Sequence, residues 1–305
     1  MTTDREAALH WATTVLGRDG VETVGEVTWP HERTWSALAR IPTTRGTAWL
    51  KVVPSELRRE AALTALVARR RPDATVVVHG HEPDRGWLLL GDAGRSLRAL
   101  VPEDGDLSRW RAALRLYAGL QRDLAGDVGT MLAAGVPDLR GQRLLTSFVD
   151  LVEELDLGAD ARAAAPEVGA LVDVLAGSGV PDSVQHDDLH DAQVFVDDTG
   201  RTRITDWGDA CVAHPFLSLA VTLDGVIGWG LRDVEGSEDV LPYQRGYLEV
   251  WAEHLGSPVA ALEPAARAAR ALGWACRVVN GHVPGDPDPT AARVRMLLSA
   301  LQRLR

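Results

Sequence analysis

Cysteine and long apolar runs are both scarce in this sequence. The 305 residues include two cysteines, Cys211 and Cys276, which is too few for a disulfide framework or a cysteine-based zinc cluster and fits a reducing compartment. Aliphatic runs such as 75–78 and 87–90 are far shorter than the ~20 apolar residues that a membrane helix needs. The first 17 residues mix charged and apolar side chains, unlike a secretory signal. We therefore expect a cytoplasmic protein without a membrane partner.

Basic residues are outnumbered by acidic ones. The chain has 32 Lys and Arg against 43 Asp and Glu, which gives a formal net charge of −11 and a pI near 5.3. Because an acidic surface repels the phosphates of nucleic acids and attracts cations, nucleic acid is not an expected partner, and the charge weakly favours a cationic small molecule. The apolar fraction of 46% and the charged fraction of 25% are ordinary for a soluble enzyme.

The first ninety residues are rich in short strand-like segments. Apolar runs at 35–41 and 47–53 flank turn-forming residues and predict a hairpin. A helix is expected from Pro54 to the residues before Pro72, followed by strands at 74–80 and 86–90. The stretch Gly91-Asp92-Ala93-Gly94 then ends the pattern. We place a domain boundary there, with an N-terminal lobe at 1–93 and a C-terminal lobe at 94–305.

The remainder of the chain shows helical periodicity with one interruption. Helices are expected near 107–124, 141–157, 160–177, 215–229, 239–255, 259–281 and 289–304. Between them, residues 193–206 have the pattern of a strand, an Asp-Asp-Thr-Gly turn and a second strand. A lone hairpin within a helical region needs a specific packing partner and often serves a site.

Polar side chains concentrate around this hairpin. The stretch 185–209 contains His186, Asp187, Asp188, His190, Asp191, Gln193, Asp206 and Asp209. Phosphoryl transfer needs a metal ion that bridges phosphates and a carboxylate that orients the attacking hydroxyl. Hard oxygen ligands of this kind suit magnesium. Since the loops before the first strand and after the second meet at one end of a hairpin, the pattern is compatible with such a site.

Two segments carry a family resemblance. Residues 186–193, His-Asp-Asp-Leu-His-Asp-Ala-Gln, resemble the catalytic loop H-G-D-L-H-P-x-N of the aminoglycoside phosphotransferase and choline kinase-like superfamily, and 204–209, Ile-Thr-Asp-Trp-Gly-Asp, resemble its I-D-W-G-D segment. The resemblance implies an α+β, protein-kinase-like two-lobed fold, with an antiparallel-sheet N-lobe and a mostly helical C-lobe. It also implies transfer of the γ-phosphoryl group of ATP, with Mg²⁺, to a hydroxyl of a small molecule.

The same resemblance assigns roles to individual residues. It implies that Asp188 is the catalytic base and that Asp206, 18 residues later, holds the magnesium that bridges the phosphates. Gln193 stands at the usual asparagine position and is the expected second magnesium ligand. The acceptor is expected to be aminoglycoside-like, an amino sugar, a choline-like alcohol or another metabolite.

The N-terminal half resembles the same superfamily in the corresponding order. Leu50-Lys51-Val52-Val53 is similar to the strand whose lysine contacts the α- and β-phosphates, and Lys51 is the only lysine of the chain. Glu60 is at the position of the glutamate that pairs with that lysine, although Glu56, one turn earlier, is an alternative. The segment 87–94 resembles the last strand and hinge, which implies that the backbone near Gly91 binds adenine.

Several positions depart from the superfamily pattern. Gln193 replaces asparagine and Asp187 replaces glycine, while His214 and Ser218 stand where two acidic residues are usual. These last two changes count mildly against a direct transfer of the antibiotic substrate. The segment 27–34, where a glycine-rich loop would cover the phosphates, contains no glycine.

Less specific interpretations stay open beside these roles. Asp188 and Asp206 could be turn residues, and Gln193 a polar residue at the start of a strand. His186 is expected to brace the loop, and Trp207 to be part of the core. His190 and Asp191 could contact substrate or face solvent. Two other functions are a catalytically impaired kinase-like nucleotide-binding module and a transition-metal hydrolase built on the His-Asp cluster, although that cluster runs directly into a strand.

Overall fold

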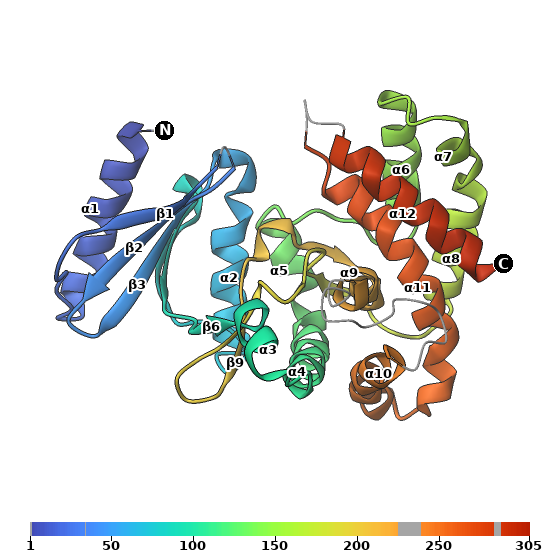
Figure 1. The fold of residues 1–305 in the computed structure, drawn as a ribbon. Helices are drawn as coiled ribbons and strands as arrows, with labels where there is room; N and C mark the ends of the chain where they lie inside the picture. The colour runs from blue at the N-terminus through green and yellow to red at the C-terminus, as the bar shows by residue number, and fades with distance from the viewer. Residues whose placement is uncertain (1, 34, 225–238, 284–287) are drawn as a thin grey trace. The chain divides into compact units, whose positions relative to one another are not determined.

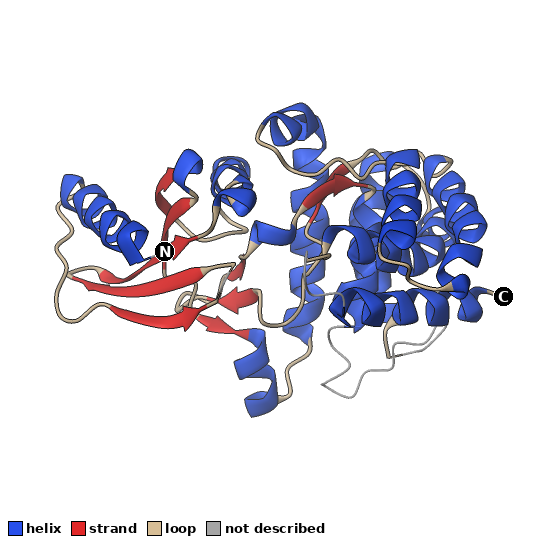
Figure 2. Ribbon diagram, turned by 90° about the horizontal axis from the view of Figure 1, so that it is seen from above, coloured by secondary structure: helices blue, strands red, loops and turns tan. Residues whose placement is uncertain are grey.

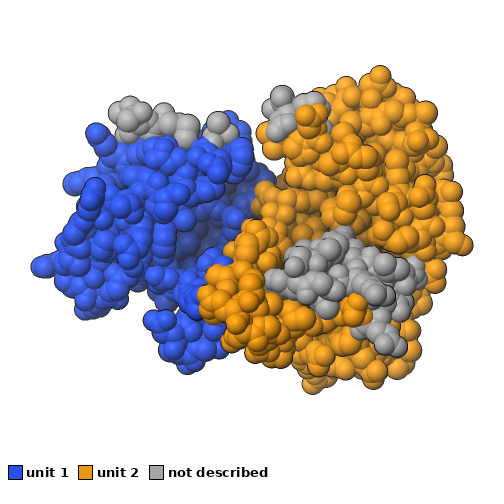
Figure 3. Space-filling view, in the orientation of Figure 1, with its two compact units in different colours: residues 1–96, 195–208 blue, residues 97–194, 209–305 orange. Residues whose placement is uncertain are grey.

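A computed structural model describes residues 2–33, 35–224, 239–283 and 288–305 of the chain. Its contacts divide it into two compact units (Figure 3). Unit 1 comprises Met1–Ser96 and Phe195–Gly208, and unit 2 comprises Leu97–Val194 and Asp209–Arg305. The chain thus leaves unit 2 after Val194 and returns to it after Gly208. The functional boundary between residues 93 and 94 stays a prediction.

Unit 1 is built on a five-stranded antiparallel sheet. Its strands in spatial order are β1 (Thr28–Glu32), β2 (Ala37–Thr43), β3 (Gly46–Val52), β5 (Trp87–Gly91) and β4 (Val78–Glu82). The predicted hairpin is present as β2 and β3, with Thr43 opposite Gly46. Strand β1 was not predicted, and its Pro30 stands in an edge strand, where a missing N–H is tolerated.

The two faces of this sheet have different neighbours. Alternate residues of β3, including Ala48 and Leu50, belong to a buried cluster with Ala8, Ala12 and Leu16 of α1 (Thr2–Arg18). Because side chains alternate along a strand, Lys51 points to the other face. That face is covered by α2 (Arg59–Arg70), which Figure 1 shows across the sheet from α1. The predicted helix from Pro54 begins as a 3₁₀ turn, η1 (Ser55–Leu57).

A second, small sheet completes unit 1. The predicted hairpin is present as β8 (Val194–Val196) and β9 (Thr202–Ile204), but it is not isolated, because β6 (Arg95–Ser96) pairs with β8. Gly94 precedes β6 with a φ of +87°, and a Cβ on it would lie 2.2 Å from the carbonyl oxygen of Val196. Only glycine fits this close approach. The expectation of a lone hairpin was wrong because a two-residue strand leaves no periodic signal.

Unit 2 is mostly helical (Figure 2). Its helices are α3 (Leu97–Asp104), α4 (Ser108–Leu124), α5 (Val128–Ala133), α6 (Gln142–Glu154), α7 (Ala159–Ala163), α8 (Ala165–Ala176), α9 (Leu219–Asp224), α10 (Leu241–Leu255), α11 (Val259–Asn280) and α12 (Asp288–Leu304). The predicted helix 160–177 is divided into α7 and α8. The predicted helix 215–229 begins as a 3₁₀ turn, η5 (Pro215–Ser218), and continues as α9, while 225–229 lie outside the described residues.

Helix α11 is the central element of unit 2. It packs against α6, α8, α9, α10, α12 and η5, and small residues allow this close packing. A Cβ on Gly273 would lie 2.3 Å from the carbonyl oxygen of Leu217, so any larger residue there would push α11 away from η5. Among the described parts of the chain, no helix has the length and apolar character to cross a bilayer.

A short strand pair positions the polar loop of unit 2. Strand β7 (Ser183–Gln185) pairs antiparallel with β10 (Cys211–Ala213), and Gln185 lies opposite Cys211. The loop that follows β7 and the residues that precede β10 therefore emerge at the same end of the pair. This pairing, which sequence periodicity did not predict, brings residues near 187 and 209 together.

Candidate active site

The first cluster of charges lies within unit 1 around Lys51. Its Nζ donates hydrogen bonds to Glu60 Oε1 and to Asp206 Oδ1, both at 2.6 Å. The predicted ion pair between Lys51 and Glu60 is thus present. Glu56, the alternative partner, is exposed on η1, and Lys51 pairs with Glu60 instead. We call Lys51, Glu60 and Asp206 the Lys51 cluster.

The electrostatics of this cluster keep the lysine charged. Burial alone lowers the pKa of Lys51, but the nearby carboxylates of Asp206 and Glu60 outweigh burial, and the net pKa is raised above its usual value. Lys51 and Glu60 have side chains only 15% and 3% exposed, whereas that of Asp206 is 50% exposed. The cluster therefore combines a buried ion pair with a carboxylate accessible from outside.

Local backbone geometry places Asp206 and Glu60. Asp206 has a φ of +66°, a left-handed conformation that aspartate tolerates better than most residues. Trp207 is fully buried, as predicted, and anchors the chain beside it. A Cβ on Gly208 would lie 3.1 Å from Glu60 Oε2. The glycine after Trp207 therefore leaves space for the Glu60 carboxylate.

The second cluster of charges lies within unit 2 and contains Asp188. Arg277 of α11 contacts three carboxylates: Nη2 is 2.6 Å from Asp188 Oδ1, and Nη1 is 2.7 Å from Asp209 Oδ2 and 3.4 Å from Asp187 Oδ2. Asn280 Nδ2 donates a 3.0 Å hydrogen bond to Asp187 Oδ2. We call these five residues the Arg277 cluster.

Burial and neighbouring charges shift the pKa values of Asp187 and Arg277. Burial raises the pKa of Asp187, and the opposing effects of Arg277 and Asn280 reduce this shift without cancelling it. Burial by itself lowers the pKa of Arg277, but Asp187, Asp188 and Asp209 raise it further, so its net pKa is above the usual value. Sequence reasoning identified Asp188 and the unusual Asp187 but missed Arg277. The only indication in the sequence was the additional carboxylate of Asp187, which needs a cation nearby when it is buried.

A buried hydrogen-bond network supports the loop from behind. The His186 backbone N–H donates to Tyr117 Oη at 2.9 Å, and Gln121 Nε2 donates to the Val184 carbonyl at 2.9 Å. Tyr117 Oη also lies 2.7 Å from Ser218 Oγ. His186 is itself fully buried. Helix α4, which carries Tyr117 and Gln121, thus fixes the strand and the start of the loop.

The two positions where acidic residues are usual have interior roles here. Ser218 is 1% exposed and donates to Gln185 Oε1. His214 is 7% exposed, and its Nδ1 accepts a 3.2 Å hydrogen bond from the Phe216 backbone N–H. Both side chains are thus engaged inside unit 2, and the expectation that they count against an antibiotic acceptor stays a prediction.

His190 and Asp191 are held by Arg98 of α3. The Asp191 carboxylate is 8% exposed and accepts from Arg98 Nη2 at 2.6 Å. Asp191 therefore does not face solvent, which was one of the two expectations for it; a contact with substrate stays a prediction. The Ala192 backbone N–H donates to His190 Nδ1 at 3.1 Å, which assigns the ring proton to Nε2. Nε2 lies 3.9 Å from Asp188 Oδ2.

The remaining predicted residues are placed by backbone bonds. The Gly91 N–H donates to the Val77 carbonyl at 2.8 Å, so any backbone contact of Gly91 with adenine would use its carbonyl or the residues that follow. The Gln193 N–H donates to the His190 carbonyl at 3.0 Å. Gln193 belongs to unit 2, whereas Asp206, the other expected magnesium ligand, belongs to unit 1.

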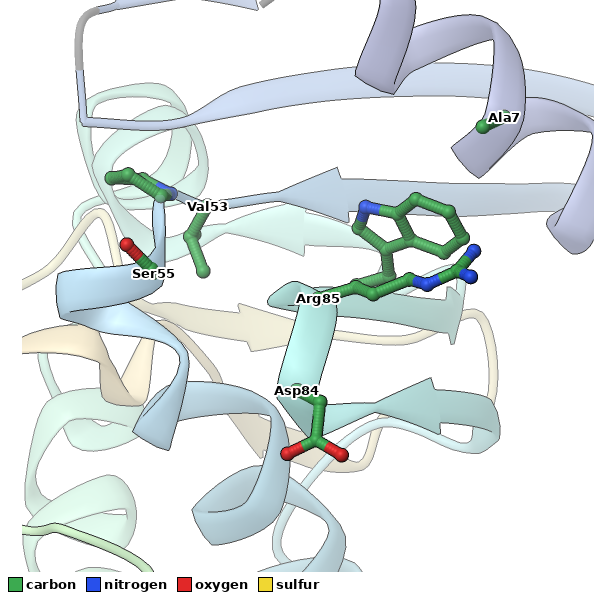
Figure 4. A pocket seen from close by; sticks show the side chains of 7 residues that line it. Ala7, Val53, Ser55, Asp84 and Arg85 are labelled. Atoms are coloured by element: carbon green, nitrogen blue, oxygen red, sulfur yellow. The ribbon is translucent and has the colours of Figure 1, made fainter.

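Two pockets, one in each unit, are lined by residues outside these clusters. In unit 1, a hollow of about 360 Å³ is lined by Ala7, Val53, Pro54, Ser55, Asp84, Arg85 and Trp87. Figure 4 shows Asp84 and Arg85 pointing away from one another there, and the Arg85 guanidinium lies 4.7 Å from the Trp87 ring centroid. A cavity of about 320 Å³ in unit 2 includes Asp182 and His214. Neither contains a residue of the two clusters.

The donor chemistry near Asp206 fits magnesium rather than a softer metal. Among the residues that the structure describes, no group of three or more His, Cys, Asp or Glu side chains could hold a metal ion. Magnesium needs no such cage, since it is commonly held by one or two carboxylates together with substrate phosphates. The accessible carboxylate of Asp206 meets that requirement, whereas a histidine-rich transition-metal site is not formed by the described residues.

Comparison with known proteins identifies the class. Residues 28–256 match the model of the Phosphotransferase enzyme family, and the chain belongs to that family. It is a small-molecule kinase, and the superfamily resemblance and the two-lobed α+β fold expected from the sequence are confirmed. No curated protein sequence matches it.

Solved structures share the fold at low sequence identity. An ethanolamine kinase from Plasmodium vivax is 13% identical with a TM-score of 0.60, covering 92% of this chain and 83% of the other. A GDP complex of aminoglycoside 2′-phosphotransferase-IIIa is 15% identical with a TM-score of 0.58, covering 98% and 99%. A ternary complex of a thermostable aminoglycoside phosphotransferase APH(4)-Ia mutant with ADP and hygromycin B is 13% identical with a TM-score of 0.56, covering 95% and 97%.

Proposed function

We propose that this protein transfers the γ-phosphoryl group of ATP, with Mg²⁺, to a hydroxyl group of a small molecule in the cytoplasm. The observation that carries the proposal is the Lys51 cluster. The sole lysine of the chain lies on the sheet face toward α2 and is bonded at 2.6 Å both to Glu60 and to Asp206, 155 residues further along the chain. Nucleotide complexes of two structural neighbours, with GDP and with ADP, support a nucleotide substrate.

Each residue expected to bind the nucleotide or the metal has a proposed role. The ammonium of Lys51 binds the α- and β-phosphates, and Glu60 keeps it in place through a buried ion pair. The backbone near Gly91 binds the adenine. Asp206 is the proposed main ligand of Mg²⁺, and Gln193, which offers an amide oxygen, is the proposed second ligand. Bound magnesium would neutralise the charge that develops on the phosphates.

Asp188 performs the proton chemistry in this proposal. Its carboxylate accepts a hydrogen bond from the acceptor hydroxyl and orients the hydroxyl oxygen toward the γ-phosphorus. A bond forms between these two atoms while the bond from the γ-phosphorus to the β–γ bridging oxygen breaks. The hydroxyl proton passes to Asp188 late in the step, and ADP leaves. Positioning and electrostatic stabilisation supply most of the acceleration in such reactions.

The acceptor is proposed to be an aminoglycoside-like molecule, an amino sugar or another hydroxyl-bearing metabolite. The net charge of −11 favours a cationic acceptor. Structural neighbours include kinases named for ethanolamine, choline, macrolides and aminoglycosides. A coupled assay of ADP release against a panel of these compounds and simple sugars would identify the class.

The proposal is tested by Asp188→Asn. The substitution keeps the size of the side chain but removes the carboxylate, so we expect turnover to fall about 1,000-fold or more while Mg-ATP binding stays near that of the wild type. ADP release and the Mg-ATP-dependent rise of the melting temperature are measured in parallel. Asp198→Asn, at an exposed residue of the β8–β9 turn, is the control and should behave as wild type. Full turnover by Asp188→Asn would refute the assignment.

A second candidate function is a nucleotide-binding module that does not catalyse phosphoryl transfer. Two observations favour it: the glutamine at position 193 and the 2.6 Å ion pair that already engages Asp188 Oδ1. The same two measurements separate the candidates. Stabilisation by Mg-ATP without ATP hydrolysis, and without turnover across the acceptor panel, would establish the module.

A further inference from the structure

Arg277 stands at the centre of the Arg277 cluster, of which the proposed reaction uses only Asp188. Its guanidinium is 9% exposed and reaches Asp187, Asp188 and Asp209 at 3.4, 2.6 and 2.7 Å. Arginine suits this place because its planar fork donates in several fixed directions at once. Nη2 is directed to Asp188, and Nη1 to Asp209 and Asp187. The arginine thus links the loop after β7 with Asp209, two residues before β10.

Asp187 provides the reason for a cation at this position. It has a φ of +66°, in a place where the superfamily pattern has glycine, and its side chain is 0% exposed. Left-handed geometry is strained for a non-glycine residue, and a buried carboxylate without a countercharge is strongly destabilising. Arg277 and Asn280, three residues apart on α11, both bind Asp187. This face of α11 therefore supplies both a countercharge and a hydrogen-bond donor to the Asp187 carboxylate.

We infer that Arg277 is the positioning residue of the catalytic carboxylate, that Asp209 and Asp187 hold Arg277 for this task, and that Asn280 in turn holds Asp187. The inference rests on the proposed function. Arg277 binds Oδ1 of Asp188, while Oδ2 lies 3.9 Å from His190 Nε2. The Asp188 side chain is 31% exposed, so it is accessible while one of its oxygens is fixed. Because Asp187 and Asp209 both bind the guanidinium, it restricts the rotamer of Asp188 more than a freely moving partner would.

The test separates positioning from charge balance. Arg277→Met removes the guanidinium and leaves Asp187 buried without its cation, so we expect a loss of both stability and turnover. The double variant Asp187→Gly with Arg277→Met also removes the buried carboxylate and restores glycine at the left-handed position. Its melting temperature should return to near the wild-type value. Arg267→Met, on the exposed face of the same helix, is the control and should leave turnover unchanged.

The double variant gives the decisive readout. We expect its kcat to remain about 100-fold below wild type because Asp188 is no longer oriented, while its KM for Mg-ATP changes less than about threefold. The rate is followed as Mg-ATP hydrolysis, with water as acceptor, and with the best acceptor of the panel. Arg277→Lys should recover part of the stability but little of the kcat, since an ammonium cannot reproduce the planar fork.

Two results would overturn the inference. A double variant with both wild-type stability and wild-type kcat would show that Arg277 only balances the charge of Asp187. A rise of kcat in Arg277→Met would show that the arginine restrains Asp188 instead of positioning it. Absence of turnover in the wild type itself would refute the proposed function, and this outcome is distinct from turnover that survives in the double variant.

Discussion

The Lys51 cluster and the Arg277 cluster differ in the cation at their centre. In unit 1, one ammonium is bound by two carboxylates, Glu60 and Asp206. In unit 2, one guanidinium is bound by the three carboxylates of Asp187, Asp188 and Asp209. Both cations are mostly buried, and both carry a raised pKa because carboxylates outweigh burial. The electrostatic principle is the same, but the donor geometry is not.

The difference fits two separate tasks. An ammonium has three donors that rotate about one bond, so Lys51 can keep Glu60 and exchange its contact with the half-exposed Asp206 for a phosphate. A guanidinium is planar and rigid, so Arg277 is suited to fixing carboxylates relative to each other. From this comparison, Lys51 is suited to binding a ligand that exchanges, and Arg277 is suited to fixing the loop after β7.

Among the substitutions that test this comparison, replacing Lys51 by arginine should have the largest effect. In Lys51→Arg the charge is retained, but the larger planar group cannot occupy the space between Glu60 and Asp206, so we expect kcat/KM for Mg-ATP to fall about 100-fold or more. ADP release at varied Mg-ATP concentration measures this. The reverse exchange in an exposed residue of the same sheet, Arg40→Lys, is the control. An unchanged kcat/KM in Lys51→Arg would mean that charge alone matters at this position.

A buried group with no opposite charge should behave differently from both clusters. His214 is almost fully enclosed, and burial lowers its pKa from 6.5 to about 3. The imidazole is therefore neutral in the folded state and takes up a proton on unfolding at pH values between these two limits. The stability that this group contributes is present above about pH 6.5 and is lost as the pH falls toward 3. At about pH 5 the loss should be ~2 kcal/mol.

His214→Asn tests this dependence. Asparagine can accept the Phe216 N–H as a helix cap does, so the variant should fold, with a modest loss of stability at neutral pH because the packing against Phe216 is reduced. The free energy of unfolding is measured by denaturant titration near pH 7 and pH 5. The difference in the free energy of unfolding between wild type and His214→Asn should become smaller on acidification. The control His10→Asn, at an exposed residue of α1, should show the same pH dependence of this free energy as the wild type. Parallel curves for His214→Asn would contradict the pKa shift.

The sequence predicted the Lys51 cluster better than the Arg277 cluster, and the reason is physical. Lys51 was distinctive as the only lysine of the chain, and its partners lie in segments with a recognisable pattern. Arg277 is one of many arginines on a helix whose periodicity reports only burial. Its role depends on the pairing of β7 with β10, which joins three-residue strands across a distance that no local pattern encodes.

The fold shows the same division. The hairpins at 35–53 and 193–206 and most helices were predicted, since they have clear periodicity and turn residues. The two-residue strand β6, the edge strand β1 with its proline, and α3, which has Pro102 inside it, were missed because local propensity is weak or opposed there. In each case tertiary contacts outweigh the local signal.

The smallest predicted effect concerns a cluster of the opposite polarity in unit 1. Asp197 of the β8–β9 turn is an acid surrounded by donors: it accepts from the Thr199 hydroxyl, the backbone N–H groups of Thr199 and Arg201, and the Arg203 guanidinium. These bonds, led by that of the Thr199 hydroxyl, lower the pKa of Asp197. Arg203 in turn donates to the carbonyls of Pro72 and Thr75, which ties the hairpin to the segment after α2.

Asp197→Ala should therefore destabilise the protein by about 1–2 kcal/mol, measured by denaturant unfolding. We expect kcat to change less than about threefold, because Asp197 lies at the turn of the β8–β9 hairpin and Asp206 follows the opposite end of β9. The neighbouring Asp198→Ala, at an exposed position of the same turn, should change stability by less than about 0.5 kcal/mol. If both substitutions had equal effects, the turn would be stabilised by its backbone alone. In that case an acidic centre in this protein would not organise its surroundings as the two buried cations do.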